Sequence, residues 1–124
     1  MKLLTHNMLT SRCLKGVVTG YPLGLVAKEI KVQPSDFNKD FIVRVIPKLD
    51  WNVFWTTAKQ IGYEGNLTEQ LIENFESNED FLRDVHHALV EVDIYEGSLI
   101  CPETNRKFQI NEGIPNMLVK EDEV

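Results

Sequence analysis

The residues in this chain whose side chains ordinarily bind metal ions or act as nucleophiles are two cysteines and three histidines. They are Cys13, Cys101, His6, His86 and His87. A structural zinc site takes four ligands, mostly thiolates and imidazoles, in closely spaced pairs. Thr104 lies where a second thiolate after Cys101 would stand, and a hydroxyl does not replace a thiolate. Because only Cys13 and Cys101 are present, we expect no bound zinc.

Nothing in the sequence completes a catalytic site around these residues. His86 and His87 are adjacent, so on a helix they point about 100° apart and do not bind one metal ion from the same face. We expect one to pack against a sheet and the other to lie near a helix C-terminus. Each cysteine is expected to be a buried small hydrophobe. The seven glycines are scattered, so no phosphate loop or adenosylmethionine pocket is predicted. The sequence predicts no enzyme.

Composition and charge point to an ordinary globular chain that does not hold nucleic acid by itself. The 124 residues are 43% hydrophobic and 26% charged, with a formal net charge of −6. No basic stripe is present to neutralise phosphates. The stretch 64–84 is acidic, with Arg83 as its only basic residue. This stretch is interpreted as a solvated helical face, and the alternatives are a docking surface for a basic partner or a face that repels RNA.

The beginning of the chain lacks the apolar run of a signal peptide, and no stretch approaches the roughly 18 apolar residues of a membrane span. We therefore expect no membrane association and an intracellular location. A disulfide between Cys13 and Cys101 is not expected in a reducing compartment.

The middle of the chain carries helical patterns. Asn38 and Asp50 are expected to cap two helices, 39–46 and the one after residue 50, with Pro47 ending or kinking the first. A third, short helix is expected from Thr68. A fourth is expected after a capping box of Ser77 and Asp80. The apolar faces expected are Phe41, Ile42 and Val45, then Phe54, Trp55, Ala58 and Ile61, then Leu71, Ile72 and Phe75, and finally Phe81, Leu82, Val85 and Leu89.

The two ends carry strand patterns. Residues 3–32 are expected to form short strands and loops. The later strands expected are 90–96, 98–101, 107–110 and 114–119, joined by turns at 96–97, 102–106 and 111–113 and followed by a frayed acidic tail at 121–123. The patterns together predict an α+β chain. Residues 1–33 and 88–124 would build a small antiparallel sheet domain, and 34–87 would be a helical insertion.

Several stretches carry a resemblance to a known family. EGSLICP at 96–102, RKFQI at 106–110 and GIPNML at 113–118 resemble the sheet of the multifunctional methyltransferase subunits, the small tRNA methyltransferase activator family of eukaryotes and archaea. MKLLTHN at 1–7 resembles the opening of that family. So do FN at 37–38, IPK at 46–48 before Trp51, and FLR at 81–83 leading to His86 and His87. The pieces span the whole chain in the expected order.

The resemblance implies a zinc-ribbon-like sheet with an inserted helical domain. It also implies a non-catalytic subunit that binds, solubilises and activates several methyltransferases, each of which binds the S-adenosylmethionine itself. The implied partners act on tRNA guanosine, tRNA wobble uridine, small-subunit rRNA (guanosine N7 and adenosine N6) and a glutamine of the translation release factor. The sequence departs from the zinc-bearing members, which place cysteine pairs at both termini, because only Cys101 matches a ligand position. An animal-type member with a metal-free sheet is therefore expected.

A partner-binding hypothesis follows for the final predicted strand. It is apolar and close to the end of the printed sequence, where an edge strand would lie, and an exposed edge invites strand addition from another chain. The candidate partner-binding residues are Leu3, Thr5, Asn7, Phe108, Ile114, Pro115, Asn116, Met117, Leu118 and Val119. For Leu3 and Phe108, ordinary core packing is an equally good interpretation. The alternative function is an RNA-binding ribbon module that presents substrate to a methyltransferase, against which the negative charge argues.

Overall fold

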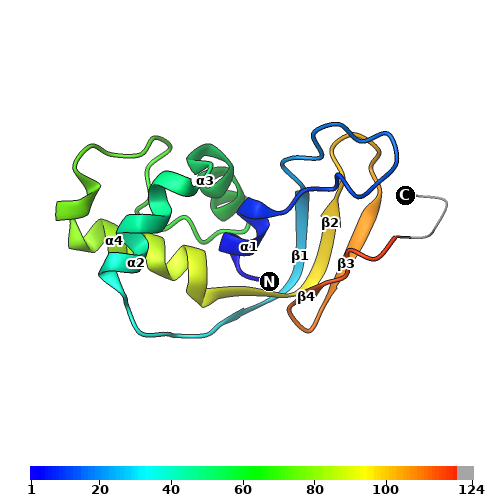
Figure 1. The fold of residues 1–124 in the computed structure, drawn as a ribbon. Helices are drawn as coiled ribbons and strands as arrows, with labels where there is room; N and C mark the ends of the chain where they lie inside the picture. The colour runs from blue at the N-terminus through cyan, green and yellow to red at the C-terminus, as the bar shows by residue number, and fades with distance from the viewer. Residues whose placement is uncertain (120–124) are drawn as a thin grey trace.

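The computed structural model describes residues 1–119, and the predicted frayed tail at 121–123 lies outside this range. Most helices lie at one end of the molecule and the strands at the other (Figure 1). The helical elements are α1 (Leu3–Met8), α2 (Lys39–Val45), η1 (Ile46–Lys48), α3 (Trp51–Gln60), η2 (Phe75–Ser77), α4 (Glu79–His86) and the π-helical turn η3 (His87–Glu91). The strands are β1 (Gly24–Val32), β2 (Val92–Ile100), β3 (Lys107–Asn111) and β4 (Ile114–Pro115). No helix within residues 1–119 is long and apolar enough to cross a membrane.

The four strands form one antiparallel sheet in the order β1-β2-β3-β4. Leu25 of β1 lies opposite Leu99 of β2, which in turn lies opposite Phe108 of β3. All three side chains are at most 2% exposed, so this row forms the sheet's contribution to the apolar core. A strand from the first third of the chain therefore pairs with one from the last third. The predicted α+β class with an antiparallel sheet is confirmed.

The two predicted helix caps are confirmed. The Asn38 side chain accepts a hydrogen bond from the Phe41 amide at 3.0 Å. The Asp50 side chain accepts one from the Val53 amide at 3.2 Å. Each cap satisfies an amide that has no partner inside its helix, which typically stabilises the helix by about 1 kcal/mol.

The predicted apolar face of the first helix is right for Ile42, which is buried, and for Val45, which is half-buried against the core, and it is wrong for Phe41. Ile42 and Ile46 are buried, at 0% and 1% exposed, whereas Phe41 is 37% exposed. The chain continues from α2 directly into η1, where Pro47 occupies an early position that needs no amide donor. Ile46 is thereby placed one turn after Ile42, on the same side.

The helix predicted from Thr68 is absent, and only the short turn η2 forms in that region. The indole Nε1 of Trp51 donates to the Thr68 carbonyl at 3.1 Å, and that of Trp55 donates to the Leu67 carbonyl at 3.3 Å. In a helix these two carbonyls would accept from amides four residues later. Because α3 supplies donors to both carbonyls, the segment packs on α3 as an extended loop.

The capping box predicted from Ser77 and Asp80 is also wrong. Asn78 is the N-cap of α4, and its side chain accepts from the Phe81 amide at 3.1 Å. Ser77 instead donates its hydroxyl to the Asn74 carbonyl at 2.9 Å. Helix α4 therefore begins one residue later than a Ser77 cap would place it. Its predicted apolar stripe is confirmed, since Phe81, Leu82, Val85 and Leu89 are all buried.

The first residues fold as helix α1, where short strands and loops had been predicted. The helix buries Leu3, His6 and Asn7, which is the spacing of one helical face. Two of those three residues are polar, so the face has no apolar pattern in the sequence. A helix of six residues is held by its tertiary contacts rather than by propensity.

The turn predicted at Glu96 and Gly97 is wrong, because β2 runs without interruption through both residues. Gly97 lies opposite Ala27 of β1. A Cβ added at Gly97 would lie 2.2 Å from the Val26 carbonyl oxygen. Glycine is therefore required here by the close approach of a neighbouring strand, next to the irregular register of β1, and not by a turn.

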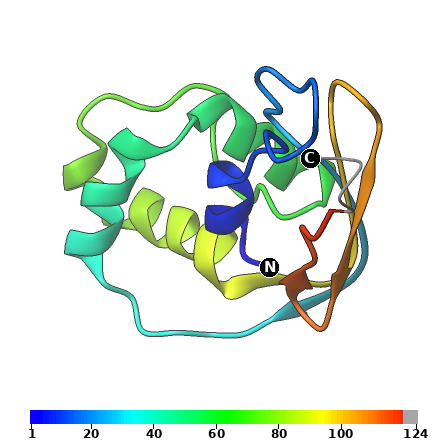
Figure 2. The ribbon, with the colours of Figure 1, turned by 45° about the vertical axis from the view of Figure 1, so that its right-hand side comes forward.

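The predicted division into 1–33 with 88–124 and 34–87 stays a prediction. The structure adds that α1, which belongs to the first of these parts, contacts α3 in the second. In a view turned by 45°, α1 lies in the middle of the molecule, with α2 and α4 on one side and the sheet on the other (Figure 2). Residues from both parts form a single apolar core cluster.

Candidate partner-binding edge

Strand β4 is placed by a tight hairpin from β3. Glu112 and Gly113 both have positive φ, at 52° and 78°, as a two-residue hairpin loop requires. Asn111 lies opposite Ile114, and the Asn116 amide donates to the Gln109 carbonyl at 2.8 Å. The predicted turn at 111–113 is confirmed. The predicted final strand at 114–119 is only partly right, because the assigned strand ends at Pro115.

The exposure of residues 114–119 nevertheless alternates with the period of a strand. Ile114 is 68% exposed and Leu118 is 82% exposed, with Asn116 exposed between them. Pro115, Met117 and Val119 are half-buried, and Met117 and Val119 pack against the apolar core. One face of this segment, which we call the β4 edge (residues 114–119), therefore holds it to the protein. The other face is open to solvent.

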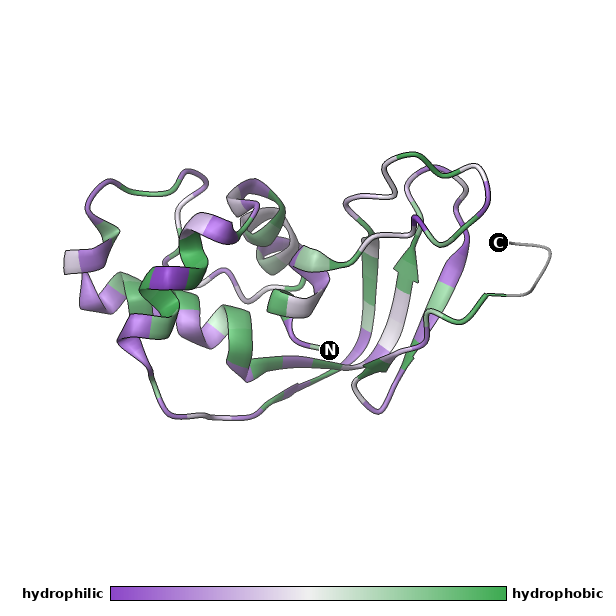
Figure 3. Ribbon diagram, viewed as in Figure 1, coloured by the Kyte–Doolittle hydropathy of each residue, from purple (hydrophilic) through white to green (hydrophobic). Residues whose placement is uncertain are grey.

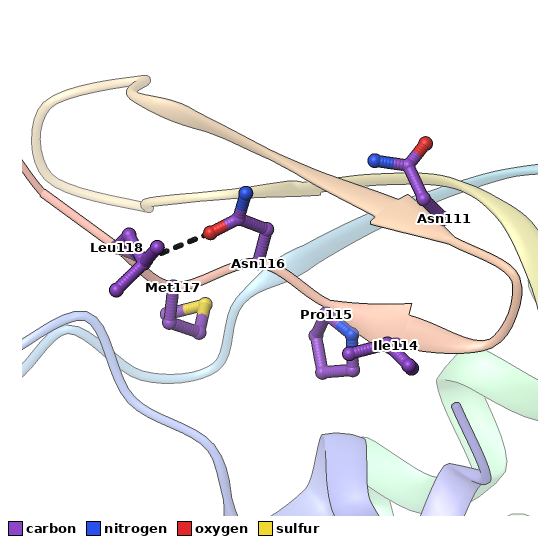
Figure 4. Close-up of a pocket in the computed structure, with 6 residues that line it drawn as sticks. All are labelled: Asn111, Ile114, Pro115, Asn116, Met117 and Leu118. Carbon is purple, nitrogen blue, oxygen red and sulfur yellow. Dashed lines mark hydrogen bonds between the residues drawn. The ribbon is translucent and has the colours of Figure 1, made fainter.

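The β4 edge borders an open, largely apolar groove of about 610 Å³, lined by Asn111 and residues 114–118. The ribbon that follows β4 is coloured as hydrophobic in Figure 3. Pro115 and Met117 project from one side of the chain and Asn116 from the other (Figure 4). The Asn116 side chain accepts from the Leu118 amide at 3.1 Å, which is a local Asx turn beside the groove (Figure 4).

The sheet has a second edge strand, β1, and that edge is protected. The Gln60 side chain donates to the Leu25 carbonyl at 2.8 Å, which occupies one acceptor on the free side of the strand. The register of β1 is irregular between Ala27 and Ile30, and Lys28 and Lys31 are exposed. Bulges and lysines are the usual means of discouraging edge-to-edge pairing. The β4 edge lacks lysines, so it is the better site for an added strand.

The amino group of Met1 anchors the hairpin that leads into β4. It lies 2.5 Å from the Asp93 carboxylate, 2.8 Å from the Ile94 carbonyl and 2.6 Å from the Gly113 carbonyl. The sequence contains no local signal for this contact, because Met1 and Gly113 are brought together only by the folded sheet. A partly buried charge-assisted contact of this kind fixes the position where β4 begins.

Of the other predicted partner-binding residues, only Thr5 is exposed. Leu3 and Phe108 are each 1% exposed and belong to the core. Asn7 is 4% exposed and bonds with its side chain to both the amide and the carbonyl of Asp50. Leu3, Asn7 and Phe108 therefore hold the fold together, and we do not carry them into the proposed interface.

The histidines and cysteines are not grouped into a catalytic site. His6 bonds through Nε2 to the Leu23 carbonyl at 2.7 Å, and burial lowers the pKa of its ring although that hydrogen bond raises it. The prediction of a buried cysteine is confirmed for Cys101 and wrong for Cys13, which is exposed, and both are free. Within residues 1–119, no three His, Cys, Asp or Glu side chains are grouped to hold a metal ion.

The prediction for the histidine pair is partly right, because His87 is the C-cap of α4. His86 packs edge-on against Phe37, with ring centroids 5.5 Å apart, and not against the sheet. His87 is the exposed member of the pair. Both rings approach one carboxylate: His86 Nε2 is 3.6 Å and His87 Nδ1 is 2.9 Å from the Glu91 oxygens. The π-helical turn η3 brings Glu91 back to both rings.

Comparison with known proteins decides the family. The model of the Trm112p-like protein family matches residues 2–113. The chain belongs to the Trm112p-like family. A relative from Bos taurus, named a multifunctional methyltransferase subunit TRM112-like protein, is 46% identical over 99% of this chain and 98% of the relative. A relative from Arabidopsis thaliana, named multifunctional methyltransferase subunit TRM112 homolog A, is 45% identical over the whole of both chains.

A solved structure of a family member has the same fold. It is the Trm112 complex with Mtq2 from E. cuniculi, described as responsible for methylation of the eRF1 translation termination factor. The TM-score is 0.58 at 20% identity, covering 95% of each chain. At this identity the likeness establishes the fold of a Trm112p-like chain and no more.

Proposed function

We propose that this chain is a non-catalytic subunit that binds, stabilises and activates several S-adenosylmethionine-dependent methyltransferases. The observation that carries the proposal is the β4 edge, a largely apolar segment that is packed on one face and open on the other. The naming of its Trm112p-like relatives as methyltransferase subunits supports the class of partner.

The backbone of the β4 edge offers a short set of groups for strand addition. In an antiparallel pair, alternate residues turn their backbone groups toward the neighbouring strand. Asn116 turns its amide toward β3, so the groups of Pro115 and Met117 face the other way. Pro115 has no amide, which leaves its carbonyl and both groups of Met117 for a partner. We propose that the methyltransferase contributes a strand whose pairing centres on Met117.

The side chains explain how one edge serves several enzymes. Backbone pairing does not depend on the partner's side chains, so it tolerates different sequences. Ile114 and Leu118, both strongly exposed, add an apolar contact area beside the groove. Covering an apolar patch on each enzyme raises its solubility, and binding only the folded enzyme raises its stability by mass action.

We also propose which enzymes the chain binds and that it binds no cofactor itself. The expected clients are the enzymes that modify tRNA guanosine, tRNA wobble uridine, rRNA guanosine N7, rRNA adenosine N6 and a release-factor glutamine. The description of the E. cuniculi Trm112 complex supports the last of these. S-adenosylmethionine would be bound by the client, and the chain would work in cytoplasm and nucleus without contacting nucleic acid directly.

The test compares two exposed apolar residues of matched exposure. Leu118 is 82% exposed on the β4 edge, and Val18 is 81% exposed on the loop before β1. Leu118→Ser is expected to weaken binding to a client methyltransferase by about tenfold to a hundredfold, because burial of a leucine contributes about 1.5–3 kcal/mol. Val18→Ser is expected to leave the affinity unchanged. Titration calorimetry with the release-factor methyltransferase measures both.

The same two variants give a second readout in cells. Coexpression with the client should recover less soluble enzyme for Leu118→Ser than for Val18→Ser. Equal affinities and equal recovery for both variants would contradict the proposal. Salt-sensitive RNA binding by the isolated chain would instead favour the RNA-presenting module.

A further inference from the structure

Resemblance to a zinc-ribbon-like sheet implies a metal where the loop 9–22 meets the turn 101–106, and the residues there do not fit one. The positions that face each other are Ser11, Cys101 and Thr104. Their donors are two hydroxyls and one thiol, whereas zinc takes four nitrogen or sulfur ligands. Cys13 is exposed, and Cys101 is 0% exposed with the Ser11 hydroxyl 3.0 Å from its sulfur. A protein hydroxyl therefore lies against the thiol.

The Cys101 sulfur is surrounded by hydrogen-bond donors. Burial raises the pKa of the Cys101 thiol, but hydrogen bonds from the Ser11 and Thr104 side chains and from the Thr104 and Glu103 amides outweigh it and lower the pKa. Backbone amides directed at a sulfur would also suit a metal-bound thiolate. The Ser11–Cys101 contact is one link between the loop 9–22 and the turn 101–106, and a charged connection lies beside it.

Glu103 makes that connection. One of its carboxylate oxygens accepts from the Gly20 amide at 2.6 Å and the Thr19 amide at 3.0 Å, and the other accepts from the Val18 amide at 3.2 Å. Three successive amides directed at one anion form a nest, a recurrent anion-binding arrangement. These amides, Gly20 first, hold the pKa of Glu103 below its usual value.

The backbone is shaped for this contact. Gly20 has a φ of +59°, and a Cβ there would lie 2.8 Å from both the backbone nitrogen and the hydroxyl of Ser11. The Ser11 amide donates to the Gly20 carbonyl at 2.9 Å, which closes the base of the loop. The glycine thus allows the 18–20 amides to converge on Glu103 while Ser11 reaches Cys101.

We infer that the Glu103 carboxylate is an electrostatic latch that fastens the loop 9–22 to the turn 101–106 in place of a structural metal. The turn joins the end of β2 at Ile100 to the start of β3 at Lys107. The latch therefore holds the end of the sheet at which β3 begins, whereas β4 pairs with Ile110 and Asn111 at the other end of β3. The latch is a property of the chain by itself and is independent of any client enzyme.

Amide hydrogen exchange in the full chain tests the latch. Glu103→Gln keeps the size of the side chain and removes its charge, and Glu29→Gln removes an exposed charge from β1 as the matched control. We expect exchange at Val18, Thr19 and Gly20 to become faster by on the order of tenfold in Glu103→Gln, because charged hydrogen bonds are roughly twice as strong as neutral ones. Glu29→Gln should exchange at the wild-type rate.

An internal exchange reference and a zinc determination distinguish a local latch from general unfolding and from a metal site. The amides of Ile94 and Leu99 in the buried part of β2 serve as an internal reference and should stay protected. Faster exchange there too would mean general unfolding and would overturn a local latch, as would unchanged exchange at 18–20. Chain purified from zinc-supplemented medium should contain only traces of zinc and should not respond to a chelator. Stoichiometric zinc, with loosening of 9–22 on its removal, would overturn the inference.

Discussion

The Asn7 side chain spans the junction between α1 and α3. Its carbonyl oxygen accepts from the Asp50 amide and its amino group donates to the Asp50 carbonyl, each at 3.0 Å. Asp50 is also the cap of α3, so one residue fixes both the start of that helix and its distance from α1. Asn7 is needed for the shape of the molecule before any partner binds.

Removing this pair of hydrogen bonds gives a residue-scale prediction. Asn7→Ala is expected to lower the free energy of unfolding by about 1–2 kcal/mol, because the Asp50 amide loses its partner while the Asp50 carbonyl keeps only the Phe54 amide. Asn66→Ala, at an exposed loop position, should change it by less than about 0.5 kcal/mol. Urea unfolding followed by fluorescence of Trp51 and Trp55 measures both variants, and equal midpoints would contradict the assigned role.

Individual residues also show what the sequence can predict. Asn38 and Asp50 were predicted as caps because a cap bonds to an amide three residues away, which is local information. Gly97 was mistaken for a turn because its requirement comes from the Val26 carbonyl on another strand. The helix predicted from Thr68 does not form, because two indoles from α3 donate to the carbonyls of Leu67 and Thr68. Contacts between distant parts of the chain decided each error.

At the scale of elements, Glu91 joins the turn η3 to the segment between β1 and α2. Its carboxylate accepts from the Ser35 amide at 2.8 Å, and its carbonyl accepts from the Gln33 amide at 2.8 Å. Burial raises the pKa of Glu91, but hydrogen bonds from Ser35 and His87 and the charge of the nearby histidines outweigh it and lower the pKa.

A lowered folded-state pKa sets the direction of the pH dependence. The charged Glu91 stabilises the fold above its unfolded pKa of about 4.5, and this stabilisation is lost as the pH falls through the lower folded value. Glu91→Gln should therefore be less stable than wild type at neutral pH, with the difference shrinking between about pH 5 and pH 3. Urea unfolding across that range measures it. A difference that stays constant with pH would show that the charge of Glu91 contributes nothing.

The two sheet edges also differ as elements. β1 has an irregular register, exposed lysines and a carbonyl occupied by Gln60, whereas the β4 edge has exposed Ile114 and Leu118. The sequence predicted the apolar run at 114–119, because its residue types are local. It did not predict that regular pairing would end at Pro115. β3 begins at Lys107 and is long enough to continue the pairing, but the Leu118 amide donates to the Asn116 side chain instead.

At the scale of the whole molecule, the acidic stretch 64–84 and the β4 edge lie at opposite ends. The acidic stretch 64–84 belongs to the helical end, and β4 belongs to the sheet end (Figure 1). A methyltransferase seated on the β4 edge would therefore leave the acidic end uncovered. Whether that end docks a basic partner or repels RNA stays a prediction.

Hydrogen exchange at the Met117 amide, with and without a client methyltransferase, tests the central claim most directly. In the free chain this amide is expected to exchange rapidly, because it faces away from β3 and no partner for it is found within residues 1–119. In the complex it should become protected, while the β1 amides keep their rates. Rapid exchange at Met117 in a fully formed complex, or new protection along β1 instead, would contradict strand addition at the β4 edge.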